Sequence, residues 1–204
     1  MKPIDTVVLA SGRGSNFQAI VNAVKDGSLS GINLRALVVD RAETGAEKIA
    51  REAGIEVHLV QFSAFVDRAA FDDAVLSVLS ELNPDLVMTL GWMRILTAEL
   101  VENFDGRIIN IHPSLLPAFK GMHAQRQASE YGVRVSGATV HFVDSGVDTG
   151  PIILQEAVTL EPGMSPEAVA DAILVAEHRI IVEAARLFAS GKIKLSDRQV
   201  MIDP

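Results

Sequence analysis

An amide and an imidazole stand two residues apart in the segment RIINIHPSLLPAFKG, residues 107–121. The segment begins as an apolar strand, so the spacing of Asn110 and His112 predicts that both side chains point to the same face of that strand. An amide can donate a hydrogen bond to an oxyanion, and an imidazole can donate or accept a proton near neutral pH. The pair therefore has the chemistry of an acid–base site. A histidine that only ends a strand by bonding to the backbone fits the spacing equally well.

A carboxylate partner for His112 is available in HFVDSGVDTGPI, residues 141–152. Asp144 and Asp148 flank a glycine-rich turn there, and Asp148, which a Thr-Gly pair follows, is the better candidate. A carboxylate bonded to the ring favours the charged imidazolium and fixes its orientation, as an acid catalyst requires. The alternative is that Asp148 only forms the turn, which is the commoner role of aspartate at such positions.

A glycine-rich turn between a strand and a helix is predicted in VVLASGRGSNFQAI, residues 7–20. Backbone N–H groups and the positive helix end of such a turn can hold a phosphate, with Gly14, Ser15 and Asn16 at the helix start. The alternative is an ordinary glycine turn before a capped helix. The spacing is not a dinucleotide fingerprint, because Phe17 stands where the third glycine would be. A nicotinamide oxidoreductase is therefore disfavoured.

The segment GWMRIL, residues 91–96, places Trp, Met and aliphatic residues directly after a predicted strand. It could line an apolar ligand slot, and core packing explains the composition equally well. The chain contains no cysteine, which excludes disulfides, thiolate nucleophiles and sulfur-ligated metals. Its histidines lack the spacing of zinc ligands, so we expect no metal.

The elements that position these residues follow a regular order in the first two thirds of the chain. Short β-rich runs alternate with helical ones, which indicates parallel strands joined by helical crossovers. The predicted strands lie at 6–11, 34–40, 56–60, 85–90 and 107–111, and the predicted helices include 68–82, 97–104 and 123–132. Ligands of such sheets bind beyond the carboxyl ends of the strands, which is where Asn110 and His112 stand.

The alternation changes after residue 132. Two extended segments, 135–144 and 150–160, follow one another with only a glycine-rich turn between them, which indicates an antiparallel edge. A long last helix is predicted from Ser165 as N-cap and Pro166 at its first position. The sequence thus predicts an α/β fold with a doubly wound, mostly parallel, Rossmann-like sheet and an antiparallel edge in the C-terminal half.

Composition sets further limits on partners and location. With 204 residues, of which 49% are apolar, we expect one compact domain. The net charge of −8 argues against a general nucleic-acid or anionic-membrane binder. No apolar stretch reaches the roughly 18 residues that cross a bilayer, and the N-terminal segment reads as a first strand rather than a signal peptide. We expect a soluble protein of the reducing cytoplasm.

Four motifs together resemble the phosphoribosylglycinamide formyltransferase family, the folate-dependent enzymes of purine synthesis. The motifs stand in the family's order and approximate spacing, and they are ASGRGSNFQAI, GWMRIL, NIHPSLLPAFKG and HFVDSGVDTGPIILQ. The resemblance covers nearly the whole chain and tails off after about residue 190. It implies formyl transfer from 10-formyltetrahydrofolate, as co-substrate, to glycinamide ribonucleotide without a metal. It also implies a single domain over 1–204, with a phosphate-binding half about 1–83 and a folate-binding, catalytic half about 84–204.

The resemblance assigns roles to individual residues. It implies the catalytic trio Asn110, His112 and Asp148. It places one group at the substrate, with Gly14, Ser15 and Asn16 at the phosphate and Glu177 near the ribose and glycinamide end. It implies folate contacts from a second group, which comprises Arg68, Met93, Arg94, Ile95, Leu96, Asn110 and Val143. The family also places a hydroxyl such as that of Thr139 near the reaction centre, although Thr139 also fits plain strand content.

Several rival functions stay open from the sequence. Methionyl-tRNA formyltransferase and formyltetrahydrofolate hydrolase share a similar Asn, His and Asp arrangement, but they normally carry an extra domain for which 204 residues leave no room. A nucleotide-binding module without turnover is an alternative from another class. The expected partners are small-molecule substrates only, with no nucleic acid and no membrane. The residues do not decide between a monomer and a homodimer.

Overall fold

The structure of the chain is a computed structural model that describes residues 2–196 and 198–203. The chain divides into two compact units, Met1–Ile109 and Asn110–Pro204, and each is described by itself. The interpretation of residues 1–204 as a single formyltransferase domain stays a prediction.

The first unit alternates strands and helices as predicted. Its elements are β1 (Ile4–Ala10), α1 (Ser15–Lys25), β2 (Ile32–Val39), α2 (Gly45–Glu52), β3 (Glu56–Leu59), η1 (Phe62–Ala64), α3 (Arg68–Leu82), β4 (Leu86–Thr89), α4 (Ala98–Asn103) and the start of β5 (Ile108–His112). Strand β1 pairs in parallel with β2 and β4, and β2 pairs in parallel with β3. Every residue of β4 is buried, which explains its uninterrupted apolar run, since parallel strands covered on both faces do not alternate.

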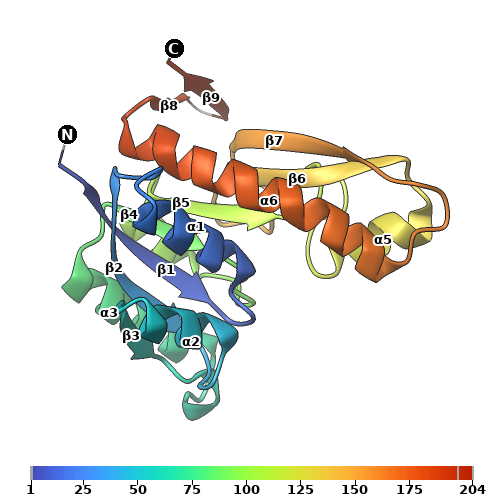
Figure 1. Cartoon of the computed structure of the whole chain (residues 1–204). Coiled ribbons are helices and arrows are strands. Elements are labelled where there is room, and N and C mark those ends of the chain that lie inside the picture. The colour runs from blue at the N-terminus through green and yellow to red at the C-terminus, as the bar shows by residue number, and fades with distance from the viewer. Residues whose placement is uncertain (1, 197, 204) are drawn as a thin grey trace. The chain divides into compact units, whose positions relative to one another are not determined.

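The second unit is built on an antiparallel pair. It contains the end of β5 and the elements α5 (Ala124–Tyr131), β6 (Val135–Phe142), β7 (Ile152–Thr159), α6 (Pro166–Ala189), β8 (Ile193–Ser196) and β9 (Gln199–Ile202). Strands β6 and β7 are antiparallel. Helix α6 lies along both strands, with α5 beside it (Figure 1). The Ser165 hydroxyl accepts from the backbone N–H of Ala168, and Pro166 opens the helix, as predicted.

The order of the seven strands is β3-β2-β1-β4-β5-β6-β7. The predicted fold class, a mostly parallel α/β sheet with an antiparallel edge, is confirmed. The order reverses between β1 and β4, and ligands of doubly wound sheets bind beyond the strand ends at this point. The hairpin of β8 and β9 was not predicted, because its two four-residue strands are largely exposed and show no clear alternation.

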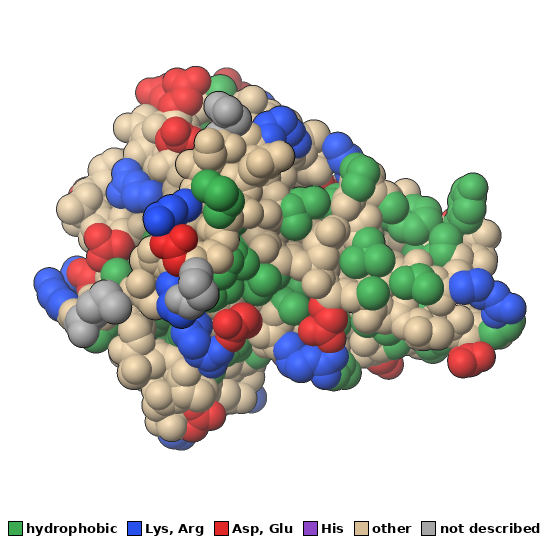
Figure 2. Space-filling view, turned by 90° about the horizontal axis from the view of Figure 1, so that it is seen from above, with side chains coloured by type: hydrophobic (Ala, Val, Ile, Leu, Met, Phe, Trp, Pro, Cys, Tyr) green, Lys and Arg blue, Asp and Glu red, His purple; other side chains and the backbone are tan. Residues whose placement is uncertain are grey.

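The surface carries charges of both signs. On the face seen in Figure 2, Lys and Arg side chains are interspersed with Asp and Glu rather than gathered into one basic area. Among the described residues, no helix is both long and apolar enough to cross a bilayer.

Candidate active site

The proposed catalytic trio lies entirely in the second unit. Asn110 and His112 come from β5, and Asp148 comes from the turn between β6 and β7. His112 Nδ1 is 3.3 Å from Asp148 Oδ2, and the two side chains are only 6% and 13% exposed. The fold therefore brings the imidazole and the carboxylate into direct contact in a largely water-excluded place.

Both ring nitrogens of His112 face oxygen atoms. Nε2 donates to the backbone carbonyl of Phe119 at 2.8 Å, while Nδ1 faces the Asp148 carboxylate. A neutral ring carries a single N–H and can donate to only one of these oxygens, whereas an imidazolium can donate to both. The surroundings thus fix the ring plane and provide acceptors for the protonated form.

The Asp148 carboxylate is held by backbone as well as by histidines. Oδ2 accepts from the N–H of Gly121 at 2.7 Å, and Oδ1 lies 3.7 Å from His141 Nε2. Asp148 has a φ of 50°, in the left-handed region that Asp tolerates better than most residues. At Gly150 a Cβ would stand 1.8 Å from the carbonyl oxygen of Phe142, so only glycine allows the turn to close there.

Asp144, the other candidate carboxylate, has a different task. Its Oδ1 accepts from the hydroxyl of Thr149 at 2.6 Å and from the N–H of Gly146 at 3.1 Å. These bonds shape the turn itself and leave Asp148 as the carboxylate that contacts His112. The preference for Asp148 over Asp144 agrees with this geometry.

Sequence reasoning missed one histidine of the cluster, His141 on β6. It is buried, and its Nδ1–H donates to the carbonyl of Phe142 at 2.8 Å. This bond leaves Nε2 of the neutral ring as an acceptor, and Asn110 Nδ2 lies 3.1 Å away as its donor. His141 therefore orients the Asn110 amide. The signal that could have found it is the two-residue alternation of β6, which puts His141 on the same face as Thr139.

The pKa values of the pair reflect burial and mutual contact. Burial lowers the pKa of His112 below its ordinary value, and this outweighs the Phe119 carbonyl and the Asp148 charge, which both raise it. Burial raises the pKa of Asp148, but the N–H of Gly121 and the charge of His112 hold the pKa below the ordinary value. Asp148 thus favours the imidazolium as expected, whereas the net shift of the buried ring is in the opposite direction.

This lowered pKa makes a prediction about stability. The unfolded chain binds a proton at His112 more readily than the folded protein, so the free energy of unfolding should fall as the pH drops below the ordinary histidine value of 6.5. One such group contributes a slope of up to about 1.4 kcal/mol per pH unit. His112→Asn should remove this contribution, which urea unfolding at several pH values between neutrality and mild acid would measure.

The control for this prediction is His123→Asn, which changes an exposed histidine of the same unit at a left-handed position that Asn tolerates. Burial also lowers the pKa of His178, so the wild-type slope has more than one source. The difference between wild type and His112→Asn isolates the active-site ring. Parallel stability curves for these two proteins would contradict the assignment.

Thr139 ties the loop after His112 to the sheet. Its hydroxyl donates to the carbonyl of Ser114 at 2.7 Å and accepts from the N–H of Leu116 at 3.1 Å and from Gln155 Nε2 at 3.0 Å. The hydroxyl is fully buried and engaged by these bonds. Its contacts are those of a residue that holds the loop in place.

The predicted phosphate turn lies in the first unit. Gly14 is the N-cap of α1 with a φ of 79°, and no side chain caps the helix. A Cβ on Gly14 would stand 2.7 Å from Cα of Ala46, so the turn and the start of α2 meet in backbone-to-backbone contact. Ser15 and Asn16 begin the helix, and its first turn carries no acidic residue. An uncapped helix start of this kind suits an anion.

The predicted folate segment, Met93–Leu96, follows β4 in the same unit and is bonded to the phosphate turn. The N–H of Met93 donates to the Ser11 hydroxyl at 3.0 Å, and the N–H of Ser11 donates to the carbonyl of Gly91 at 3.1 Å. Met93 and Ile95 are more than half exposed, whereas Leu96 is buried. Arg68 is exposed at the first position of α3. Ser11 and the segment Met93–Leu96 lie beyond the ends of β1 and β4, where the strand order reverses, whereas Arg68 follows β3 and η1.

Two further predicted residues lie in the second unit. Glu177 is buried on α6, and Val143 is half-buried at the start of the turn that carries Asp148. Within residues 2–196 and 198–203, no cluster of three or more His, Asp or Glu side chains could hold a metal ion.

Comparisons with known proteins agree with this arrangement. The formyl transferase family matches residues 4–185. Phosphoribosylglycinamide formyltransferase from Escherichia coli (strain K12) is 38% identical over 200 residues, which are 98% of this chain and 94% of that protein. A trifunctional purine biosynthetic protein adenosine-3 from Bos taurus is 40% identical over 196 residues, 96% of this chain, but the chain spans only 19% of that protein's length.

A solved structure gives the same result for the fold. Glycinamide ribonucleotide transformylase 1 from Symbiobacterium toebii superposes with a TM-score of 0.96 and 44% identity, over 99% of this chain and 95% of that one. The resemblance that the four motifs indicate is thereby confirmed. The chain therefore belongs to the formyl transferase family and is a one-carbon group transferase.

Proposed function

We propose that the chain transfers the formyl group of 10-formyltetrahydrofolate to the amine of glycinamide ribonucleotide in purine nucleotide biosynthesis. The observation that carries the proposal is the buried contact of 3.3 Å between His112 and Asp148, with Asn110 joined to the same cluster through His141. The names of the Escherichia coli and Symbiobacterium toebii relatives support the choice of acceptor. The absence of cysteine supports a cytoplasmic location.

The reaction begins when the free amine of the ribonucleotide attacks the formyl carbon and a tetrahedral oxyanion forms. The amide nitrogen of Asn110 carries two hydrogens, of which one donates to His141. The Asn110 amide is the proposed donor to the oxyanion, together with the protonated ring of His112. Because the protein holds two substrates in line, it also removes much of the entropic barrier, which is worth up to about 7–11 kcal/mol in favourable cases.

Asp148 completes the reaction by supporting the imidazolium and organising a water molecule. That water moves the proton from the attacking amine to the folate nitrogen, directly or through His112. The oxyanion then collapses, the bond between the formyl carbon and the folate nitrogen breaks, and tetrahydrofolate and the formylated ribonucleotide are released. Burial lowers the pKa of His112 in the free protein, but the negative charge that develops on the oxyanion favours the protonated ring. No covalent intermediate with the protein is required.

Binding of the two substrates is proposed for separate groups of residues. Gly14, Ser15 and Asn16 hold the phosphate at the start of α1, and Glu177 lies near the ribose and glycinamide end. Arg68, Val143 and the segment Met93–Leu96 hold the folate. Within the described part of the chain, the backbone N–H and C=O groups of residues 94–96 make no backbone–backbone hydrogen bond, which supports a role in binding a polar heterocycle.

A Gly14→Ala variant tests the phosphate turn. Its methyl group would collide with the backbone of Ala46, so the turn should move. The N–H groups at the start of α1 should then no longer point toward the phosphate. We expect KM for glycinamide ribonucleotide to rise by about tenfold or more, which corresponds to about 1.4 kcal/mol of lost binding. KM for 10-formyltetrahydrofolate should change much less, and initial-rate kinetics with each substrate varied would show the difference.

Gly27→Ala is the matched control for this variant. Gly27 has a similar φ of 82°, but a Cβ there meets no atom within 4 Å. Both alanines carry the same left-handed strain, which costs about 1–2 kcal/mol, and only the one at position 14 should raise KM. An equal rise for both variants would show that strain alone is responsible.

The function itself is tested with the purified chain and 10-formyltetrahydrofolate, with and without glycinamide ribonucleotide. We expect release of tetrahydrofolate, followed spectrophotometrically, to depend on the ribonucleotide. Release without the ribonucleotide would identify a formyltetrahydrofolate hydrolase. Binding of the ribonucleotide without any turnover would identify a binding module, and either result would overturn the proposal.

A further inference from the structure

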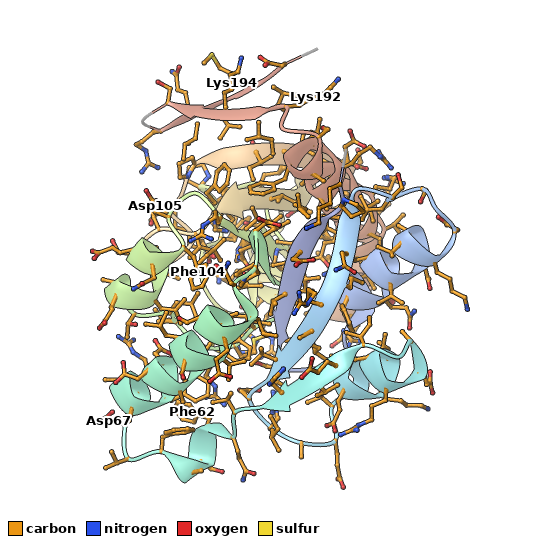
Figure 3. All side chains as sticks on the ribbon, turned by 90° about the vertical axis from the view of Figure 1, so that its left-hand side faces the viewer. Phe62, Asp67, Phe104, Asp105, Lys192 and Lys194 are labelled. Atoms are coloured by element: carbon orange, nitrogen blue, oxygen red, sulfur yellow. The ribbon has the colours of Figure 1, made fainter. Side chains whose placement is uncertain are left out.

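The guanidinium of Arg94 is engaged inside the first unit. Its Nε donates to Asp40 Oδ2 at 2.7 Å, and the Asp40 side chain is completely buried. The guanidinium carbon also lies 3.9 Å from the ring centroid of Phe62 in η1, a residue labelled in Figure 3. A buried carboxylate therefore offsets its charge, although the other oxygen of that carboxylate also lies 3.7 Å from Arg41 Nε. One face of the Arg94 guanidinium is covered by an aromatic ring.

The segment around Arg94 is fixed at both ends as well. The N–H of Met93 donates to the Ser11 hydroxyl at 3.0 Å, and the N–H of Thr97 donates to Asp72 Oδ2 at 2.6 Å. Ser11 follows β1, Asp40 follows β2, and Asp72 lies on α3, so three elements hold five consecutive residues. Burial raises the pKa of Asp72, but the N–H of Thr97 works against that rise.

These anchors hold a short stretch in which residues 94–96 make no backbone–backbone hydrogen bond within the described part of the chain, and in which two apolar side chains are exposed. Met93 is 59% exposed and Ile95 is 51% exposed, on either side of the inward-turned Arg94. Because the Arg94 side chain points inward, the side chains of its two neighbours, Met93 and Ile95, point outward. If the guanidinium left Asp40, the stretch would be free to rotate, and the backbone N–H and C=O groups of residues 94–96 would point in other directions.

We infer that Asp40 is a positioning residue for folate binding, and that it acts through Arg94. The guanidinium, through its Nε–H, serves as an internal strut of the segment. This inference rests on the proposed function, because it assumes that the segment Met93–Leu96 binds the folate. Asp40 itself touches no substrate and contributes by keeping the segment in its binding shape.

The chain contains its own probe for this strut. Trp92 is the only tryptophan, and its ring stacks on Phe71 with centroids 5.9 Å apart and planes inclined by 19°. Phe71 in turn contacts Phe62 edge-on at 5.1 Å, and Phe62 is the ring beneath Arg94. Tryptophan emission of the ligand-free protein therefore reports on the arrangement of the segment, independently of any activity.

The test compares Asp40→Asn with Asp5→Asn. Asp5 also pairs with an arginine of the first unit, Arg35, at 3.0 Å, but it stands at the opposite end of β1. Asp40→Asn should shift the Trp92 emission and raise KM for 10-formyltetrahydrofolate by about tenfold, with KM for the ribonucleotide unchanged. Asp5→Asn should change neither emission nor KM. A folate KM that stays at the wild-type value, with or without an emission shift, would overturn the inference, as would an equal rise for both substrates.

A double variant separates the strut from a direct contact. If Arg94 acts only through its bond to Asp40, adding Arg94→Met to Asp40→Asn should raise the folate KM by less than about threefold more. A large further rise would mean that the guanidinium touches the folate itself. If Asp40→Asn does not fold, Phe62→Leu replaces it, because this variant removes the ring beneath the guanidinium at a half-buried site. Phe62→Leu should shift the Trp92 emission and raise the folate KM. Wild-type emission together with a wild-type folate KM would contradict the inference.

If the wild-type chain shows no formyl transfer at all, the proposed function fails. The role of Asp40 is then tested by Trp92 emission and by fluorescence titration with 10-formyltetrahydrofolate. Weaker folate binding by Asp40→Asn than by Asp5→Asn would still support the inference. Equal binding by the two variants would overturn it.

Discussion

Asp148→Asn is expected to lower kcat by a factor of about 10² to 10⁴, the range that general acid–base groups contribute. The carboxylate is the only negative charge that the described residues place against His112, at 3.3 Å. An amide of the same size keeps the shape of the turn but cannot neutralise an imidazolium or hold a proton in transit. KM for both substrates should change little, because the charge is needed most in the transition state.

Two variants serve as controls for this loss. Asp171→Asn changes an exposed aspartate of α6 and should leave kcat at the wild-type value. Asp144→Asn changes the carboxylate that accepts from Thr149 and Gly146, and its amide oxygen can still accept these bonds. It should therefore lose far less activity than Asp148→Asn. Comparable losses at positions 144 and 148 would mean that the turn's shape, rather than a carboxylate at His112, is what catalysis needs.

Much of the fold could be predicted because local and global signals agree. The helix predicted over 68–82 is α3, and the last helix begins at the predicted cap, Ser165. Continuous apolar runs predicted the buried parallel strands, and the change of pattern after residue 132 predicted the antiparallel pair. The hairpin of β8 and β9 escaped because short exposed strands carry neither a hydrophobic period nor a burial signal.

The approach of Asp148 to His112 could be predicted from strand ends and a glycine turn, but the details of the cluster could not. Phe119 contributes a carbonyl oxygen and Gly121 contributes an N–H, and backbone groups are the same in every residue type. His141 was hidden for a different reason. It stands inside a strand, where a histidine is usually read as a structural residue that hydrogen-bonds to the backbone. Its Nδ1–H does donate to the carbonyl of Phe142, but its Nε2 accepts from the Asn110 amide.

The direction of Arg94 shows the same limit in the first unit. The sequence predicts that the segment Met93–Leu96 faces a ligand, but it does not say which side chains turn inward. That outcome depends on Asp40 and Phe62, which are 54 and 32 positions earlier in the chain. Residue types therefore predicted the chemistry of the site, whereas the pairing of distant side chains decides which atoms are available for it.

Asn110→Ala is expected to lower kcat by a factor of about 10² to 10³, the usual effect of removing one oxyanion donor. Folate binding should be retained, because the loss concerns an interaction that strengthens only as negative charge develops on the formyl oxygen. Single-turnover kinetics would measure the chemical step, and fluorescence titration of Trp92 would measure binding. Asn103→Ala, which changes an exposed asparagine of α4, should match the wild type in both.

A second substitution at the same position separates the donor from its shape. Asn110→Asp keeps the size of the side chain but replaces the NH₂ group with an oxygen, so it can donate neither to an oxyanion nor to Nε2 of His141. If donation is what catalysis needs, the aspartate variant should be at least as slow as the alanine variant. If the aspartate variant kept wild-type turnover, the amide would act only as a spacer between β5 and β6. The oxyanion would then have to be stabilised by His112 alone.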